Sequence, residues 1–146
     1  MTALAIIFRL LHLRGEKLNR MLGNHILVEF YGCDNETLND VDLIGAEMIQ
    51  AAYEAEATVV DRRFHKFAPQ GVSGVLILAE SHLTIHTWPE HGYAAVDLFT
   101  CGDTLEPWKA FDHIKSALKA TNVSTVEMKR GRMADIEAAN KREIFA

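Results

Sequence analysis

The segment formed by residues 58–100 constrains the fold of this chain more than any other part of the sequence. Apolar runs and apolar–polar alternation mark four strand-like stretches in it, at residues 58–67, 73–80, 83–88 and 93–100. Pro69-Gln70-Gly71 breaks the chain after the first stretch, and Pro89 begins the turn before the last. Connections of this length join neighbouring antiparallel strands, so the segment predicts an antiparallel sheet.

Two further strands and two helices complete the predicted fold. Residues 25–31 and 123–128 read as the first and last strands. Apolar residues recur at three- and four-residue steps over about residues 37–55, which indicates an amphipathic helix. Pro107 suits the first turn of a second helix, because its missing N–H costs little there. The buried stripe of this second helix is expected to consist of Trp108, Phe111, Ile114 and Leu118.

This order of elements predicts an α+β fold, an antiparallel sheet with both helices packed on one face. The opposite face also needs cover, and strands as apolar as residues 75–78 favour a dimer formed sheet to sheet. The charged tail from Lys129 is expected to be a solvated or frayed end.

Composition excludes several classes of protein. With 146 residues, 49% hydrophobic and 24% charged, the chain fits one globular domain. A net charge of -5 argues against nucleic-acid binding, and no apolar run is long enough to cross a membrane. The two cysteines, Cys33 and Cys101, make no disulfide framework, so a reducing cytoplasm is expected. Residues 1–20 lack the features of a signal peptide and are treated as an extension of uncertain role, before a domain at 21–132 and a tail at 133–146.

Reactive side chains gather where the most apolar run ends, at Glu80-Ser81-His82. Histidines 65, 82, 86 and 91 could bind a metal, but their spacing matches neither HExxH nor a zinc finger. A serine hydrolase is a second possibility, but no G-x-S-x-G motif surrounds Ser81.

A third possibility is that Ser81 attacks its own chain. Its hydroxyl oxygen can reach the carbonyl carbon of Glu80, so that the acyl group moves from the nitrogen of residue 81 to this oxygen and forms an ester. A base then removes the α-proton of residue 81, the chain splits by elimination, and the remaining dehydroalanine hydrolyses to a pyruvoyl group. Such a ketone can form a Schiff base and act as an electron sink without an external cofactor or a metal.

The segment GVSGVLILAESHLTIHTWPEHGYAAVDLFTCGD, residues 71–103, resembles the prokaryotic S-adenosylmethionine decarboxylase proenzymes. The resemblance runs from LGNHILVEFYGCD, at about Leu22, through PWKAFDHIKSALKA to about Arg132. It implies a self-cleaving zymogen, with a β chain of residues 1–80 and an α chain of residues 81–146. The processed enzyme is then expected to decarboxylate S-adenosylmethionine with a pyruvoyl group and supply aminopropyl groups for spermidine biosynthesis.

Matched by position, the resemblance implies a role for seven residues. They are Glu80 and Ser81 on either side of the cleaved bond, Ser81 as the source of the pyruvoyl group, His86 as the processing base, Ser73 as the hydroxyl that assists processing, Cys101 as the proton donor to the substrate, Phe67 against the adenine and Glu90 on the ribose. A histidine can take a proton near neutral pH, and a thiol is mostly protonated there, which agrees with two of these roles.

The spacing of Ser81 and His86 adds a geometric prediction. An offset of five on one continuous strand places the two side chains on opposite faces of the sheet. Either a turn or bulge at His82-Leu83 redirects His86, or the His86 that faces Ser81 comes from another subunit. The resemblance favours the second, a homodimer of two α and two β chains forming an αββα sandwich. Ser81 and Cys101 would come from one protomer, and Phe67, Ser73, His86 and Glu90 from the other.

Two alternatives stay open. The substrate could be arginine or another basic amino acid, because the shape of the pocket is not visible in the sequence. The chain could also be a non-processing partner that activates a homologue, although an intact Ser81, His86 and Cys101 argue against that.

Overall fold

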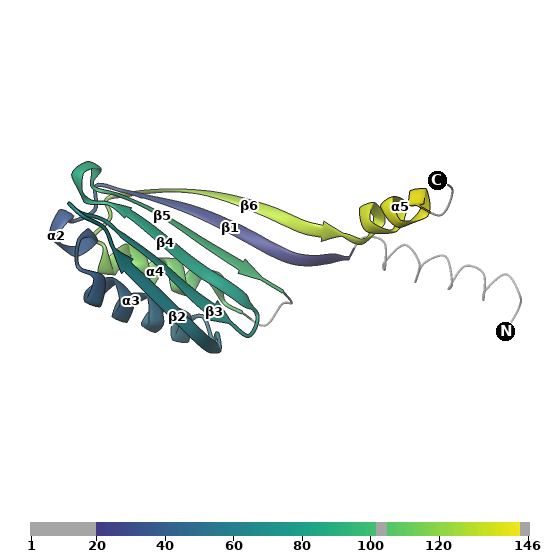
Figure 1. Cartoon of the computed structure of the whole chain (residues 1–146), viewed down its shortest axis with the longest axis horizontal. Helices are drawn as coiled ribbons and strands as arrows, with labels where there is room; N and C mark the ends of the chain where they lie inside the picture. Colours follow the sequence, from purple (N-terminus) through teal and green to yellow (C-terminus); the bar gives the residue numbers. More distant parts are fainter. Residues whose placement is uncertain (1–19, 102–104, 144–146) are drawn as a thin grey trace, which may run out of the picture.

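The computed structural model describes residues 20–101 and 105–143. The described elements, in chain order, are β1 (Met21–Tyr31), α2 (Asn35–Leu38), α3 (Val41–Glu54), β2 (Val59–Lys66), β3 (Val72–Leu78), β4 (Ser81–Trp88), the 3-10 helix η1 (Pro89–His91), β5 (Tyr93–Thr100), α4 (Pro107–Ala117), β6 (Asn122–Arg132) and α5 (Met133–Glu143). The six strands form one antiparallel sheet in the order β2-β3-β4-β5-β1-β6, and α3 and α4 lie on one face of it (Figure 1). The predicted α+β class is confirmed.

Alternation along the strands explains why one face is covered by helices. Along β1, β3, β4 and β5 buried residues alternate with more exposed ones, and most of the buried ones are apolar and meet the apolar stripes of α3 and α4. The largest contributors are Ile26, Val28 and Phe30 of β1, Leu76 and Leu78 of β3, Leu83 and Ile85 of β4, Val96 and Leu98 of β5, Ile44 and Met48 of α3, and Phe111 and Ile114 of α4. We call this side of the sheet the covered face.

The other side of the sheet carries His25, Ser73, Ile77, His86 and Asp97, and we call it the open face. None of the described helices packs on it (Figure 1). Ile77 leaves 48% of its surface exposed, although the residue before it, Leu76, is fully buried on the covered face. The open face therefore has an exposed apolar surface, as expected for a face that was predicted to need cover.

The expected helix over residues 37–55 is wrong in one respect, because it is divided into α2 and α3. The Asp40 carboxylate accepts hydrogen bonds from the backbone N–H groups of Asp42 and Leu43, at 3.1 and 3.0 Å. A residue that caps the start of one helix has an extended backbone, so it cannot continue the helix before it. The neighbouring Asn39 instead accepts a bond from the N–H of Gly71, at 3.1 Å, and ties the break to the turn after β2.

The ends of the chain also differ from the prediction. The first strand begins at Met21 and the last runs to Arg132, because these two residues pair with each other beyond the rest of the sheet (Figure 1). The tail beyond Lys129 is not frayed, since α5 follows β6 directly, but residues 129–141 are all exposed or half-exposed, which agrees with the prediction of a solvated end. Residues 1–19 of the predicted extension lie outside the described residues.

Two smaller predictions are corrected as well. Trp108 does not belong to the buried stripe of α4, because 50% of its surface is exposed and Ala110 is buried instead. Strand β3 ends at Leu78, so that Ala79 and Glu80 form a tight turn before Ser81. Within the described residues, no helix has the length and apolar character needed to cross a bilayer.

Candidate active site

The peptide bond between Glu80 and Ser81 lies in the turn that joins β3 to β4, and it is held from both sides. The Glu80 carbonyl oxygen accepts a hydrogen bond from the backbone N–H of Cys101, at 3.0 Å. The Glu80 carboxylate accepts a second bond from the N–H of Thr58, at 3.2 Å. An N–H group directed at a carbonyl oxygen stabilises the negative charge that forms there when a nucleophile attacks. The arrangement therefore favours attack on the Glu80 carbonyl carbon.

Ser81 and His86 lie on opposite faces of the sheet. The pairing of β4 with β3 runs without a break from Leu78↔Ser81 to Ser73↔His86, and its pairing with β5 is equally regular. Ser81 therefore shares the covered face with Leu83, whereas His86 lies on the open face. The alternative of a bulge at His82-Leu83 is wrong, and within one chain His86 does not face Ser81.

Four of the predicted residues gather around one pocket, away from Ser81. Phe67, Ser73, His86 and Glu90 all line a pocket of about 410 Å³. The hydroxyl of Ser73 lies 2.6 Å from Nδ1 of His86, and the Phe67 ring leaves 48% of its surface exposed. The pocket therefore combines a proton-transfer pair with an accessible aromatic face and a carboxylate.

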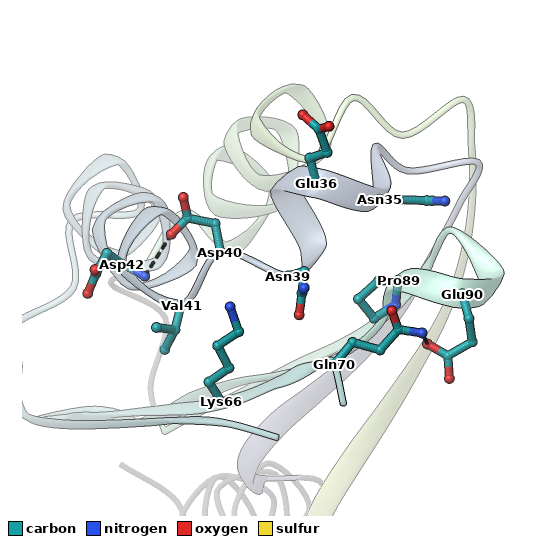
Figure 2. Close-up of a pocket in the computed structure, with 10 residues that line it drawn as sticks. All are labelled: Asn35, Glu36, Asn39, Asp40, Val41, Asp42, Lys66, Gln70, Pro89 and Glu90. Carbon is teal, nitrogen blue, oxygen red and sulfur yellow. Dashed lines mark hydrogen bonds between the residues drawn. The ribbon is translucent and has the colours of Figure 1, made fainter. Parts of the chain in front are cut away.

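A larger hollow, of about 550 Å³, adjoins this pocket on the side of α2 and α3 (Figure 2). Gln70 and Glu90 line both spaces, and the Gln70 amide donates to the Glu90 carboxylate at 3.1 Å. Neither Ser73 nor His86 lines the larger hollow, so the hydrogen-bonded hydroxyl–imidazole pair belongs to the smaller pocket alone of the two. The smaller pocket is therefore the better candidate for binding a substrate that reacts.

A third group of polar side chains lies beside Ser81 on the open face, and the sequence alone did not reveal it. The Asp97 carboxylate accepts hydrogen bonds from Nε2 of His25 at 2.9 Å, from Nε2 of His82 at 3.2 Å, and from the hydroxyl of Thr84. Nδ1 of the same His82 lies 3.4 Å from the Ser81 hydroxyl. Burial acts to raise the pKa of Asp97, but the hydrogen bonds from Thr84 and His25 outweigh it, and the pKa is lowered.

The residues considered for metal binding do not come together as the sequence spacing allowed. Among residues 20–101 and 105–143, the histidine and carboxylate groups close enough to share an ion are His25, His82 and Asp97, within 4.8 Å of one another. Their separations of 2.9 and 3.2 Å are hydrogen-bond distances, so these side chains already satisfy one another.

Comparison with known proteins identifies the family. The model of the family described as S-adenosylmethionine decarboxylase matches residues 24–131. The chain belongs to the S-adenosylmethionine decarboxylase family. A protein named S-adenosylmethionine decarboxylase proenzyme from Thermotoga petrophila is 61% identical over 117 residues, which cover 80% of this chain and 90% of that protein. A proenzyme of the same name from Thermosipho africanus is 57% identical over 117 residues, with the same shares covered.

A solved structure supports the same family. The adenosylmethionine decarboxylase of Aquifex aeolicus superposes with a TM-score of 0.72 at 38% identity, covering 77% of this chain and 92% of that one. The family, the enzyme class and a pyruvoyl group derived from the chain itself are thus confirmed as predicted. The roles of the seven individual residues stay predictions. The geometry divides these residues into two sets, one at the turn before β4 (Glu80, Ser81 and Cys101) and one around the smaller pocket (Phe67, Ser73, His86 and Glu90).

Proposed function

We propose that this chain is an S-adenosylmethionine decarboxylase proenzyme that cuts itself between Glu80 and Ser81. The Ser81 hydroxyl attacks the Glu80 carbonyl carbon, and the acyl group moves from nitrogen to oxygen. Removal of the α-proton of Ser81 then expels the Glu80 carboxylate, and the dehydroalanine left behind takes up water and loses ammonia. The bond from Cys101 N–H to the Glu80 carbonyl oxygen supports the first step, because the developing oxyanion has a donor in place.

The residues around position 81 fit a pyruvoyl group. Ser81 is half-buried and anchored at the start of β4, while Cys101 is exposed beside it, after β5. A pyruvoyl carbonyl at this position supplies an electron sink for an amine that loses its carboxylate. Cys101 then returns a proton to the substrate carbon, as an exposed thiol near the chain break can do.

We further propose that each active site is built from two chains. The observation that carries this proposal is the unbroken β4 strand, which keeps His86 and Ser81 on opposite faces of one protomer. The open face is apolar enough to meet a second sheet, with Ile77, Val126 and Met128 exposed at 48%, 60% and 48%. Although Ser81 belongs to the covered side, its hydroxyl lies 3.4 Å from Nδ1 of His82 on the open face. A partner sheet packed there would therefore bring its own His86 pocket toward Ser81, giving an αββα sandwich.

In this arrangement the pocket residues of the partner act on Ser81 and on the substrate. His86, hydrogen-bonded to Ser73, removes the α-proton of Ser81 during processing. The exposed face of Phe67 stacks on the adenine and attracts the nearby sulfonium cation, as aromatic faces attract cations. Glu90, oriented by Gln70, accepts hydrogen bonds from the ribose hydroxyls.

The names of the relatives favour S-adenosylmethionine over arginine as the substrate, and proenzymes over a non-processing partner. Product analysis with the two substrates side by side tests the first choice. Release of carbon dioxide from arginine alone would contradict it. We place the enzyme in the cytoplasm, because Cys33 and Cys101 are both free thiols and the second is exposed.

Intact-mass measurement of the purified protein tests the cleavage. We expect two chains, the second beginning with a pyruvoyl group at position 81, and a single chain from Ser81→Ala. The matched control is Ser116→Ala, on the exposed side of α4, which should be cleaved like the wild type. A wild-type chain that stays intact would contradict the proposal.

Complementation tests the shared site. Ser81→Ala and His86→Ala are each expected to be inactive, but a mixed dimer contains one site with an intact Ser81 and a partner's intact His86. Co-expression should restore about a quarter of wild-type activity, since half of the dimers are mixed and each has one working site. No recovery, with mixed dimers demonstrated, would place both residues in one chain.

A further inference from the structure

We propose that His82 and Asp97 activate the Ser81 hydroxyl for self-cleavage. We further propose that His25, fixed by Arg130, orients the Asp97 carboxylate without cancelling its negative charge. The inference rests on the proposed cleavage between Glu80 and Ser81. It assigns the first step, the attack on the Glu80 carbonyl, to a group within the same protomer. His86 of the partner then serves only the later removal of the α-proton.

The three side chains Ser81, His82 and Asp97 form a hydrogen-bonded series from hydroxyl to imidazole to carboxylate. Oγ of Ser81 lies 3.4 Å from Nδ1 of His82, and Nε2 of His82 lies 3.2 Å from Oδ2 of Asp97. A carboxylate only accepts hydrogen bonds, so Nε2 of His82 carries the proton. In a neutral His82, Nδ1 therefore has a free electron pair, and this pair faces the Ser81 hydroxyl. That is the arrangement in which a histidine acts as a base toward a serine.

Arg130 fixes the state of the second histidine. Its guanidinium lies 3.0 Å from Nδ1 of His25, and a guanidinium can only donate. His25 must accept that bond with Nδ1, so it is neutral and donates to Asp97 through Nε2, at 2.9 Å. A neutral His25 orients the Asp97 carboxylate without cancelling its charge. The negative charge of Asp97 then stabilises the positive charge that His82 gains when it takes the serine proton.

The surroundings strengthen these interactions. The side chains of His25, Asp97 and His82 are 18%, 27% and 36% exposed, and the lowered pKa of Asp97 keeps it ionised at neutral pH. The Phe99 ring packs against both imidazoles, with ring centres 5.4 Å from His25 and 5.8 Å from His82. An apolar ring at this place shields one side of the pair from water, which strengthens the electrostatic attraction between imidazolium and carboxylate.

The proposed step balances within the protein. The Ser81 hydroxyl proton passes to Nδ1 of His82 while Oγ bonds to the Glu80 carbonyl carbon. The carbonyl electrons move to the oxygen that accepts from Cys101 N–H. The carbon–nitrogen bond then breaks as His82 returns the same proton to the nitrogen of residue 81. The product is the ester with a free amine, and His82 is neutral again.

This assignment predicts that His82 and His86 variants stop at different points. Without His82 the Glu80–Ser81 bond stays an amide, whereas without His86 the ester forms but the elimination does not follow. Hydroxylamine cleaves an ester and leaves an amide intact. Treatment of the uncleaved chains with hydroxylamine therefore separates the two roles.

The experiment follows cleavage of newly made full-length protein in a cell-free translation system, by gel and intact mass. We expect His82→Ala to cleave at least about 100-fold more slowly than the wild type, in line with the loss of a general base. Hydroxylamine should release no fragment from it, and added imidazole should partly restore cleavage. The matched control is His113→Gln, because His113 also contacts carboxylates, Glu47 and Glu54 at 2.6 and 2.9 Å, but far along the chain on the helices. It should cleave at the wild-type rate.

Two more variants guard against misfolding and test the positioning role. His82→Gln keeps a donor for Asp97 but has no basic nitrogen, so it should fold and still fail to cleave. Asp97→Asn should slow cleavage less than His82→Ala and move the midpoint of the pH–rate profile to lower pH, since His82 loses its negative partner. The charged groups around His82 in that profile are Asp97 and His25, with Arg130 behind them.

Wild-type cleavage of His82→Gln, or fragments released from it by hydroxylamine, would overturn the inference and leave the proposed function intact. A wild-type protein that stays uncleaved would instead contradict the proposed function itself. An unchanged pH midpoint in Asp97→Asn would reduce that residue to a purely structural role.

Discussion

The two faces of the sheet are made by the same strands, yet they differ in almost every physical respect. On the covered face the residues of β1, β3, β4 and β5 are mostly apolar and buried, and the buried polar ones there are Thr87 and Thr100. On the open face histidines, carboxylates and a tyrosine lie half-exposed and hydrogen-bond one another across the strands, as in the pairs His25–Asp97 and Tyr93–Glu29. The first face is complete within one chain. The second is the surface on which we propose that a second chain packs.

The difference shows that alternate residues of one strand have different roles, because one set packs in the core and the other carries the polar groups of the site. Leu83 and Ile85 anchor β4 in the core, and the residues between and beside them, His82, Thr84 and His86, carry the polar groups. Ser81 lies at the junction, because it belongs to the covered side but touches His82 on the open side. A cleavage site placed there can be rigid and still be reached from the open face.

The largest effect should follow from blocking the open face. Ile77→Asp places a charge at the centre of the expected interface, where it would be buried without a partner. We expect a monomer in size-exclusion chromatography with light scattering, and loss of both self-cleavage and decarboxylation by at least about 100-fold. Asp112→Asn, an exposed change on α4 and so on the far side of the sheet, is the control. A monomer that is cleaved and active would contradict the proposal that two chains share each active site.

Next in size is a comparison of two neighbouring residues of β3. Leu76→Ala should lower the free energy of unfolding by about 2–5 kcal/mol, because it leaves a cavity in the covered face. Ile77→Ala should cost the protomer less than about 1 kcal/mol, since its side chain is half-exposed there. Both are measured by urea unfolding in the Ser81→Ala background, which keeps one chain, at protein concentrations where the protomer is monomeric. Equal losses would mean that the two faces do not differ as described.

A smaller effect should appear in acid. The pKa of Asp97 is lower in the folded protein than in the unfolded chain, so its contribution to stability is present above about pH 4 and is lost as the pH falls through the folded value. We expect the Ser81→Ala protein to lose stability more steeply below pH 4 than the same protein carrying Asp97→Asn. Melting temperatures between pH 7 and pH 3 measure this. Parallel curves would show that the histidine bonds contribute nothing to folding.

The smallest effect concerns Tyr93, also on the open face. Burial, together with the hydrogen bond to Glu29, raises the pKa of Tyr93 to about 12. The stability that Tyr93 contributes is therefore complete below pH 10, the ordinary value of a tyrosine, and is lost as the pH rises toward 12. In an ultraviolet titration one of the three tyrosines should ionise late, and Tyr93→Phe should remove that step. If Tyr53→Phe removes it instead, the assignment is wrong.

Much of the fold was predictable because its signals are local. Alternation and turn residues predicted β5 with its correct bounds, Tyr93–Thr100, and the offset of Ser81 and His86 predicted their separation on two faces. The division between α2 and α3 was missed because it depends on the cap formed by Asp40. Helix α5 was missed because its sequence is mostly polar and gives no buried stripe.

The site was predictable only in part, for a related reason. A resemblance names residues one position at a time, and it assigned roles to Ser81, His86 and Cys101 without the structure. Those roles stay predictions. The group of His25, His82 and Asp97 spans β1, β4 and β5, so it exists only once the register of three strands is fixed. Asp97 in an otherwise apolar strand was the available signal, but nothing local says which histidines meet it.

The order of the strands gives the proposed chain break at Ser81 a consequence for folding itself. Strands β1, β2 and β3 precede the break and β4, β5 and β6 follow it, yet in the sheet β1 lies between β5 and β6. The two pieces are therefore interleaved, and neither can leave without dismantling the core. Before cleavage each protomer can refold as one continuous chain, but afterwards its recovery requires two separate polypeptides to meet and pair within one sheet. Maturation thus converts a protein that can refold into one that is held mainly by the height of its unfolding barrier.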